Sequence, residues 1–170
     1  NLAQRSGRDE QAIAALLVLS RRFGAGEVWI VRAAGLHLQR GQVVRADALL
    51  EQSALVMPAT AEKFWQMRAD VAQMAGNSAA AQQAYERLNV PGKAVSKNLL
   101  SQAAFVEQRD AFAAAQLYQR AWQQDRQPST AVSALYQWNR VKAWAPAEAF
   151  LAELPAEDLA RLEQDPTFLE

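Results

Sequence analysis

EVWIVRAAGLHLQRGQVVRADALLEQSALVMP, residues 27–58, is the stretch that decides the fold, because its pattern recurs on both sides of it. Apolar residues recur at helical spacing before and after Gly41, and Pro58 prevents further helix at the end of the stretch. The stretch therefore predicts a helix, a tight turn at Gly41 and a second helix. Because the pattern recurs, we interpret it as one unit of an array.

An array is indicated by a set of turn positions that recur at steps of 34, 35, 33 and 33 residues. These positions are Gly7, Gly41, Gly76, Arg109 and Lys142. Five residues after each turn stands an alanine: Ala12, Ala46, Ala81, Ala114 and Ala147. Four residues further come Leu16, Leu50, Tyr85, Tyr118 and Leu151. An offset of four residues keeps two side chains on one helical face, so the columns predict a buried stripe in which the small residue lets two helices approach closely.

A period near 34 residues with two helices per unit resembles the tetratricopeptide repeat. Trp65, Ala69 and Gly76 match the Trp, the small residue and the turn of the family's first helix, and Ala46 and Pro58 match its second helix. The resemblance covers nearly the whole chain and implies an all-α fold, an α-solenoid wound as a right-handed superhelix. Four positions depart from the family pattern, namely Arg68, Asn98, Gln102 and Leu135.

The expected domain organisation is a single solenoid segment over residues 1–170. It consists of a partial repeat 1–24, repeats at about 25–58, 59–93, 94–127 and 128–155, and a terminal helix 156–164. Residues 1–6 are expected to end one helix before a turn at Gly7, and 9–22 to form the next helix. The remaining expected helices are 27–40, 43–56, 60–75, 78–89, 94–108, 110–124, 129–141 and 146–153. Gly24 and Gly26 are expected to break the helix over residues 9–22, and Pro91 and Pro128 to end the second and third complete repeats. Because the chain opens inside a unit and ends on apolar residues 167–169, we expect it to be a segment of a longer protein.

Composition argues for a helical protein without catalytic chemistry. The chain has 51% apolar residues, ample for a core, and no run long enough to cross a bilayer. It has no cysteine, which excludes disulfides and thiolate metal sites, and His37 is its only histidine. His37 is expected to pack in the first helix of its repeat rather than to act in catalysis. The acid pairs at residues 9–10 and 157–158 are expected to stabilise helix starts. We predict no enzyme activity, no cofactor and no metal.

Charge is balanced overall but not along the chain. There are 18 basic and 18 acidic residues, so a general affinity for nucleic acid is not expected. Residues 1–45 carry a net charge of +4 and residues 143–170 a net charge of −6. This asymmetry is either an ordinary solvated surface or complementarity to a partner or to copies stacked end to end.

The five tryptophans divide into two groups. Trp65 and Trp138 fall on core columns of the first helices and are expected to pack inside. Trp29, Trp122 and Trp144 lie beside those columns. They are the better candidates for partial exposure, although packing between repeats is expected for them as well.

The family resemblance also places a binding surface, because its first helices line the concave side of the superhelix. The groove positions carry over to residues 28, 31, 35, 38 and 39 in the first complete unit and to 63, 66, 70, 73 and 74 in the second. They carry over to 96, 99, 103, 106 and 107 in the third unit and to 129, 132, 136, 139 and 140 in the fourth. The partner-binding residues predicted from this set are Lys63, Gln66, Asp70, Gln73, Leu99, Val106, Tyr136, Asn139 and Arg140. The Lys and Asn pattern that clamps a C-terminal carboxylate in some family members is absent, since Asp70 stands where Asn is needed.

The repeats, degenerate and rich in Ala, Gln, Arg and Trp, look like the periplasmic repeat regions of bacterial outer-membrane exopolysaccharide exporters, the Pel-type exporters above all. That resemblance implies a non-enzymatic scaffold for protein–protein interaction, located in the periplasm as part of an outer-membrane protein in biofilm formation. Its partner would be a polysaccharide-modifying enzyme, with no nucleic acid bound and no membrane insertion by this segment. Two alternatives remain open: a track that binds the exported polysaccharide directly, and a cytoplasmic assembly or regulatory protein.

Overall fold

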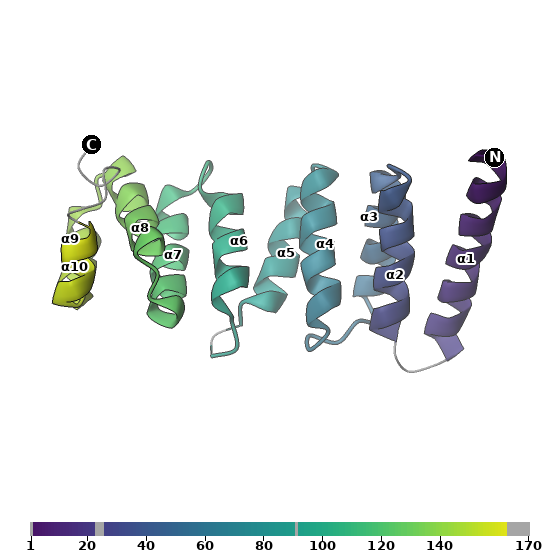
Figure 1. Ribbon diagram of the computed structural model, residues 1–170, viewed down its shortest axis with the longest axis horizontal. Helices are drawn as coiled ribbons and strands as arrows, with labels where there is room; N and C mark the ends of the chain where they lie inside the picture. Colours follow the sequence, from purple (N-terminus) through teal and green to yellow (C-terminus); the bar gives the residue numbers. More distant parts are fainter. Residues whose placement is uncertain (1, 23–25, 91, 163–170) are drawn as a thin grey trace. The chain divides into compact units, whose positions relative to one another are not determined.

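The computed structural model describes residues 2–22, 26–90 and 92–162, and in that part of the chain it contains helices and no strand (Figure 1). The helices are α1 (Leu2–Arg22), α2 (Gly26–Gln39), α3 (Val43–Ala54), α4 (Glu62–Met74), α5 (Ser78–Leu88), α6 (Ser96–Val106), α7 (Ala111–Asp125), α8 (Pro128–Arg140), α9 (Trp144–Glu153) and α10 (Ala156–Leu162). The prediction of an all-α, solenoid-type fold is confirmed. No helix among the described residues is long and apolar enough to cross a membrane.

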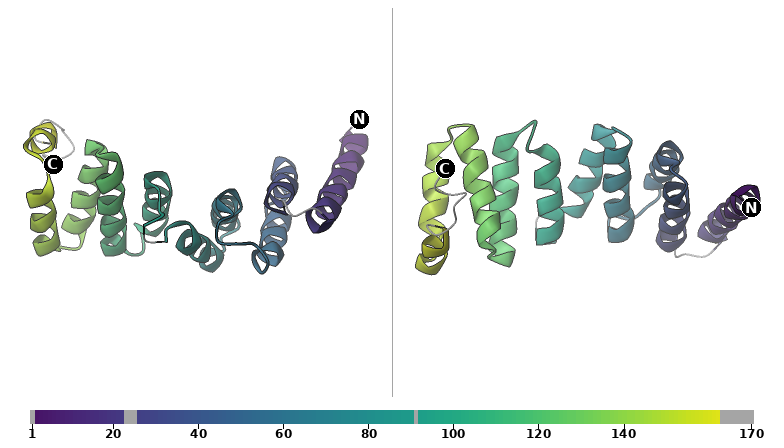
Figure 2. Two further views of the ribbon diagram at one scale, coloured as in Figure 1. Left: turned by 90° about the horizontal axis from the view of Figure 1, so that it is seen from below. Right: turned by 45° about the horizontal axis from the view of Figure 1, so that its top comes forward.

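The helices group into two compact units, Asn1–Val90 with α1 to α5 and Pro91–Glu170 with α6 to α10, here called unit 1 and unit 2. Each helix from α1 to α5, and each from α6 to α9, lies beside the next helix of its unit (Figure 2). In unit 1, α4 packs against α5 and also against α2 and α3. In unit 2, α7 packs between α6 and α8, and α10 returns to α8. Packing of each helix on its neighbours in sequence is the arrangement expected of stacked repeats.

The alanine column is fully buried at its three middle positions. Ala46, Ala81 and Ala114 each expose 0% of their surface, as the spacing predicts. At the two ends of the column the burial is weaker, since Ala12 is exposed and Ala147 is half-buried. The column therefore marks close helix–helix contacts in α3, α5 and α7, and a more open one in α9.

Three of the predicted turns use the left-handed backbone conformation. Gly41 has a φ of 68° and Gly76 a φ of 73°, values that glycine adopts at little cost. Lys142, at the same place between α8 and α9, has a φ of 54°. A lysine in this region carries the steric cost that an L-residue with a Cβ always carries there.

Replacing Lys142 by glycine is therefore expected to raise the free energy of unfolding by about 0.5–1 kcal/mol, even though glycine adds entropy to the unfolded chain. Chemical denaturation of both proteins measures the difference. Gly76→Ala is the mirror control and should be destabilising by a similar amount, because a Cβ built there meets nothing within 4 Å and only the backbone is affected. A neutral or destabilising Lys142→Gly variant would show that the lysine carries no strain.

The first helix differs from the prediction. α1 runs from Leu2 to Arg22 without interruption, so the turn predicted at Gly7 and the helix start predicted at residues 9–10 are wrong. Glycine inside a helix costs only about 1 kcal/mol relative to alanine, and helix formation is cooperative, so the flanking residues carry the helix through Gly7. The acid pair lies inside the helix, where Glu10 pairs with Arg40 at 3.8 Å.

Other boundaries shift by one or two residues. Pro128 is the first residue of α8, a position where proline is tolerated, whereas Arg126 with a φ of 53° ends α7. Gly26 is the first residue of α2, and the acid pair at 157–158 lies in the first turn of α10 as predicted. The predictions for Asn1, Gly24, Pro91 and residues 163–170 fall outside the described residues, and the repeat boundaries themselves stay a prediction.

Buried aromatic side chains contact one another in both units. In unit 1, the rings of Phe64 and Trp65 meet edge to face with their centroids 5.0 Å apart. In unit 2, Phe150 of α9 lies between Trp122 and Trp138, with centroid distances of 5.1 and 5.4 Å. Trp65 and Trp138 expose 2% and 1% of their surface, so the prediction that both belong to the core is confirmed.

Candidate functional site

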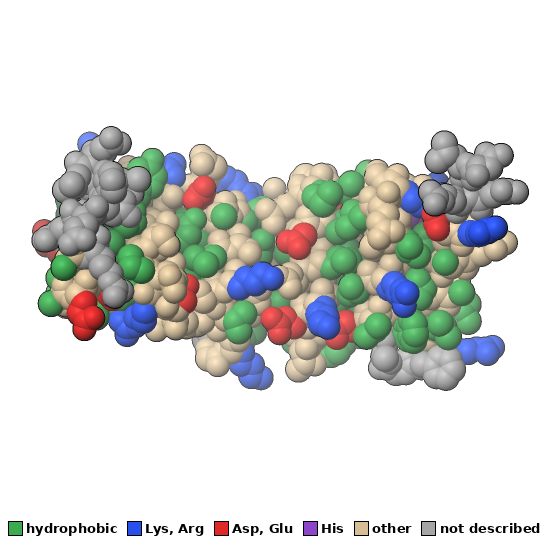
Figure 3. Space-filling model, in the orientation of Figure 1, with side chains coloured by type: hydrophobic (Ala, Val, Ile, Leu, Met, Phe, Trp, Pro, Cys, Tyr) green, Lys and Arg blue, Asp and Glu red, His purple; other side chains and the backbone are tan. Residues whose placement is uncertain are grey.

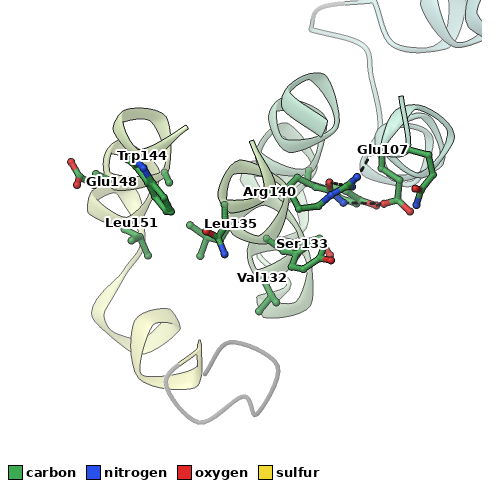
Figure 4. A pocket seen from close by; sticks show the side chains of 14 residues that line it. Glu107, Val132, Ser133, Leu135, Arg140, Trp144, Glu148 and Leu151 are labelled. Carbon is green, nitrogen blue, oxygen red and sulfur yellow. Dashed lines mark hydrogen bonds between the residues drawn. The ribbon is translucent and has the colours of Figure 1, made fainter. Parts of the chain in front are cut away.

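A groove with a volume of about 1020 Å³ lies on α8 in unit 2 (Figure 4). We call it the α8 groove. Its lining residues come from the end of α6 (Glu107, Gln108), from α7 (Tyr118), from α8 (Val132, Ser133, Leu135, Tyr136, Gln137, Asn139, Arg140) and from α9 (Trp144, Ala147, Glu148, Leu151). The groove therefore has α8 along its length, α9 on one side, and residues of α6 and α7 on the other.

The side formed by α9 is apolar. Trp144, Ala147 and Leu151 follow one another at spacings of three and four residues, which places them on one face of α9. Figure 4 shows Leu135 on the α8 side facing Trp144 and Leu151. Trp144 is 56% exposed, unusual for so large an apolar side chain. This side of the groove offers an aromatic surface and aliphatic side chains to a ligand.

The opposite side is polar and consists of a connected hydrogen-bond network. The Tyr118 hydroxyl and the Gln137 amide Nε2 both donate to Oε2 of Glu107, at 3.0 and 3.2 Å. Arg140 Nη1 donates to the backbone oxygen of Glu107 at 3.0 Å and to Oε1 of Gln137 at 2.7 Å. The network joins three consecutive helical segments and holds the Arg140 side chain in one orientation at the edge of the groove.

Tyr118 titrates abnormally because of this environment. Burial raises its pKa from 10.0 to about 12, and the hydrogen bond to Glu107 and the negative charge of that carboxylate act in the same direction. A raised pKa means that the folded protein keeps the proton at a pH at which the unfolded chain releases it. The stabilisation is therefore fully present below pH 10.0 and is lost as the pH rises to about 12.

Raising the pH through this interval is expected to destabilise the wild type more than the Tyr118→Phe variant, which cannot lose the proton. Urea denaturation at several pH values between 10.0 and about 12 measures the two dependences. Tyr85, whose pKa is raised by burial first and by the charge of Asp70 second, is present in both proteins and cancels in the comparison. Parallel curves would show that Tyr118 ionises as a free tyrosine does.

The sequence-predicted partner-binding residues fall into different places. Tyr136, Asn139 and Arg140 all line the α8 groove and are exposed, Tyr136 by 59%. Val106 is half-buried and packs against the core of unit 2 formed around Leu99. The other four predicted residues lie at helical spacing on α4 in unit 1, with Lys63, Asp70 and Gln73 exposed and Gln66 half-buried. Gln73 donates to the Tyr85 hydroxyl at 2.7 Å.

Leu99 was predicted to contact a partner, and its burial contradicts that prediction. It exposes 0% of its surface and lies in the core with Ala103, so it is not available to a partner. The buried face of α6 consists of Asn98, Leu99, Gln102 and Ala103. Asn98 and Gln102 stand at positions where the repeat pattern expects apolar or small residues, and Leu99 and Ala103, which were expected in the groove, are buried beside them. Burial of Leu99 removes a large apolar side chain from water.

Sequence reasoning missed the groove residues that come from second helices. Tyr118 of α7 and Trp144, Glu148 and Leu151 of α9 line the groove, while the prediction drew only on first helices. One signal pointed to the site, since Trp144 stands outside the core columns. The two other tryptophans of that group do not reach the groove: Trp122 is 1% exposed and Trp29 is half-buried.

Other candidates for chemistry have structural roles. His37 is half-buried as predicted, and its Nδ1 lies 2.9 Å from Oε1 of Gln42. Among the described residues there is no group of three or more His, Cys, Asp or Glu side chains that could hold a metal ion. On the face seen in Figure 3, acidic and basic side chains are interspersed, and hydrophobic side chains reach the surface between them.

Comparison with known proteins identifies the repeats. A family model described as tetratricopeptide repeat matches residues 18–170. No curated protein and no solved structure matches the chain. The match begins within α1 and covers the remainder of unit 1 and all of unit 2.

Proposed function

The chain belongs to the tetratricopeptide repeat family, and from that premise we propose that it is a non-enzymatic scaffold that binds a protein partner in the α8 groove. Repeats of this family suggest a module for protein–protein interaction and are typically not catalytic. The observation that carries the choice of site is a groove of about 1020 Å³ with two exposed aromatic side chains, Tyr136 and Trp144. Exposed aromatic side chains beside a charged arginine are typical of the residues that dominate protein–protein binding.

A finer proposal concerns the biological setting. Repeats that are degenerate and rich in Ala, Gln, Arg and Trp support a place in the periplasmic part of a bacterial exopolysaccharide exporter of the Pel type. In that setting the partner is a polysaccharide-modifying enzyme, which the scaffold recruits during export across the outer membrane. A cytoplasmic assembly protein with the same fold is the alternative, and the sequence upstream of residue 1 in the gene distinguishes them through the presence or absence of an export signal.

Direct binding of polysaccharide is the second candidate function. One observation favours it: Tyr136 and Trp144 are exposed by 59% and 56% and line the same groove, and exposed aromatic rings are platforms on which sugars stack. The polar network on the other side of the groove adds hydrogen-bonding groups of the kind that recognise hydroxyls. Protein binding and polymer binding are therefore tested with the same variants of the chain, and recovery of protein or of polymer distinguishes them.

Replacing Tyr136 by alanine is expected to reduce partner capture severalfold and to leave helicity unchanged, because the ring is largely in solvent and packs little in the free protein. The measurement is a pull-down from bacterial envelope extract with and without added polysaccharide, followed by circular dichroism of the bait. Phe112→Ala is the matched control, since Phe112 is 43% exposed on α7 and does not line the groove.

Capture of a polysaccharide-modifying enzyme without polymer supports the exporter scaffold. Retention of polymer without protein supports the carbohydrate track instead. Equal capture by wild type and Tyr136→Ala would remove the α8 groove as the binding site.

A further inference from the structure

One edge of the Arg140 guanidinium group forms no hydrogen bond with the described residues. Both protons of Nη1 are used, one by the backbone oxygen of Glu107 and one by Oε1 of Gln137. Neither Nε nor Nη2 has a hydrogen-bond partner among the described residues, and these two nitrogens present parallel N–H bonds on a single edge. Such an edge matches the two oxygens of a carboxylate and binds them more strongly than a single donor does.

The positive charge of Arg140 is also not neutralised within the chain. Its two acceptors are a carbonyl and an amide, both uncharged, and in the described part of the chain it forms no ion pair with a carboxylate. The carboxylate of Glu107, whose backbone oxygen Arg140 contacts, accepts hydrogen bonds from Tyr118 and Gln137 through Oε2. The carboxylate of Glu148 points away from Arg140 across the groove (Figure 4). A ligand that brings one negative charge to this place therefore completes the site.

Apolar side chains lie across the groove from that charge. Trp144 and Leu151 on α9 face Leu135 on α8, and Val132 lies two turns before Arg140 on the same helix. Val132 and Arg140 are eight residues apart, which corresponds to about 12 Å along α8. A peptide segment spans this distance with about two turns of helix or about four extended residues.

We propose that the α8 groove selects a partner segment that places one Asp or Glu side chain on the Nε–Nη2 edge of Arg140 and an aliphatic or aromatic side chain between Leu135, Trp144 and Leu151. This inference rests on the proposed function and narrows it to a chemical class of partner. The acid is a side chain within the segment, not a chain terminus. A run of several acids does not fit, because the Glu107 carboxylate lies beside Arg140 and repels additional negative charge.

The test starts from random twelve-residue peptides displayed on phage with both ends joined to the coat protein, so that no free terminus is available. Peptides selected on the immobilised full chain are synthesised with amidated ends, each with a partner in which the acid is changed to its amide. Affinities are measured by fluorescence anisotropy for wild type, Arg140→Met, Arg140→Lys and the matched control Arg109→Met. Arg109 is an exposed arginine in unit 2 that does not line the groove.

The expected result is enrichment of one Asp or Glu with a nearby Leu, Phe or Trp. Changing the acid to its amide, or Arg140 to Met, should each weaken binding about tenfold, and the combination should weaken it no further, which is the signature of direct pairing. Arg140→Lys should recover only part of the loss because lysine lacks the two-pronged edge. Arg109→Met should bind like wild type.

Three outcomes overturn the inference: peptides without an acid, a loss from the acid-to-amide change that is equally large in Arg140→Met, or no peptide whose binding depends on the groove. In the first two cases Trp144→Ala still weakens peptide binding if the groove is a protein-binding site, so the proposed function survives. If no peptide binds and the envelope pull-down captures no protein, both proposals fail.

Discussion

Replacing Ala81 by glutamate is expected to lower the free energy of unfolding by about 4 kcal/mol or more, the largest effect of any single change considered for unit 1. Ala81 exposes 0% of its surface and lies in α5, which packs against α4. A glutamate there has no room for its side chain and buries a carboxylate without a partner. Because whole domains are stable by only about 5–15 kcal/mol, the variant should lose much of its helical signal at room temperature.

Ala79→Glu is the matched control, since Ala79 is exposed in the first turn of the same helix. An acid in that turn interacts favourably with the helix dipole, so the control should be neutral or slightly stabilised. Thermal unfolding followed by circular dichroism compares the two variants with wild type. If both glutamates cost the same, the alanine column does not mark a tight helix–helix contact.

Replacing Phe150 by alanine is expected to cost about 3–5 kcal/mol and to abolish partner binding at the same time. Phe150 exposes 0% of its surface and meets Trp122 edge to face at 5.1 Å, with the rings at 87°. It also packs on Trp138 at 5.4 Å. The variant leaves a cavity among large rings and loses both aromatic contacts.

Partner binding is expected to fail because the ring contacts of Phe150 hold α9 in place, and α9 forms the apolar side of the α8 groove. Hydrogen exchange followed by mass spectrometry should show faster exchange over residues 144–153 in Phe150→Ala than in wild type. Phe112→Ala removes a ring that is 43% exposed and should change neither exchange nor binding. Unchanged exchange in α9 would show that the helix is held by other contacts.

Arg68 marks a place where the sequence departs from the family and the structure shows the consequence. It stands at a position where the repeat prefers an apolar residue, it is 3% exposed, and its Nε and Nη1 are buried without a partner among the described residues. The departure was visible in the sequence, but the burial of the guanidinium group depends on the helices that surround α4. This residue has no role in the α8 groove, which lies in the other unit.

Much of the secondary structure followed from local sequence alone. The turns at Gly41 and Gly76 and the helices on both sides of them are set by residues within one repeat, so a periodic pattern is enough to locate them. Two predictions failed for different reasons. Gly7 lies inside α1 because helix cooperativity outweighs one glycine, and Leu99 lies in the core because its large apolar side chain is stabilised by burial against α7.

The sequence by itself determined that the chain is a helical repeat protein and that Tyr136, Asn139 and Arg140 share one face of a first helix, because both depend on spacing along the chain. Only the tertiary structure decided that this face opens into a groove. The groove exists because α9, held at Phe150, leaves Trp144 and Leu151 facing Leu135, and because the end of α6 brings Glu107 to Gln137 and Arg140. The hydrogen bonds from Gln137 and Arg140 to Glu107 join residues 30 and 33 apart in sequence, and no periodicity within one repeat specifies them.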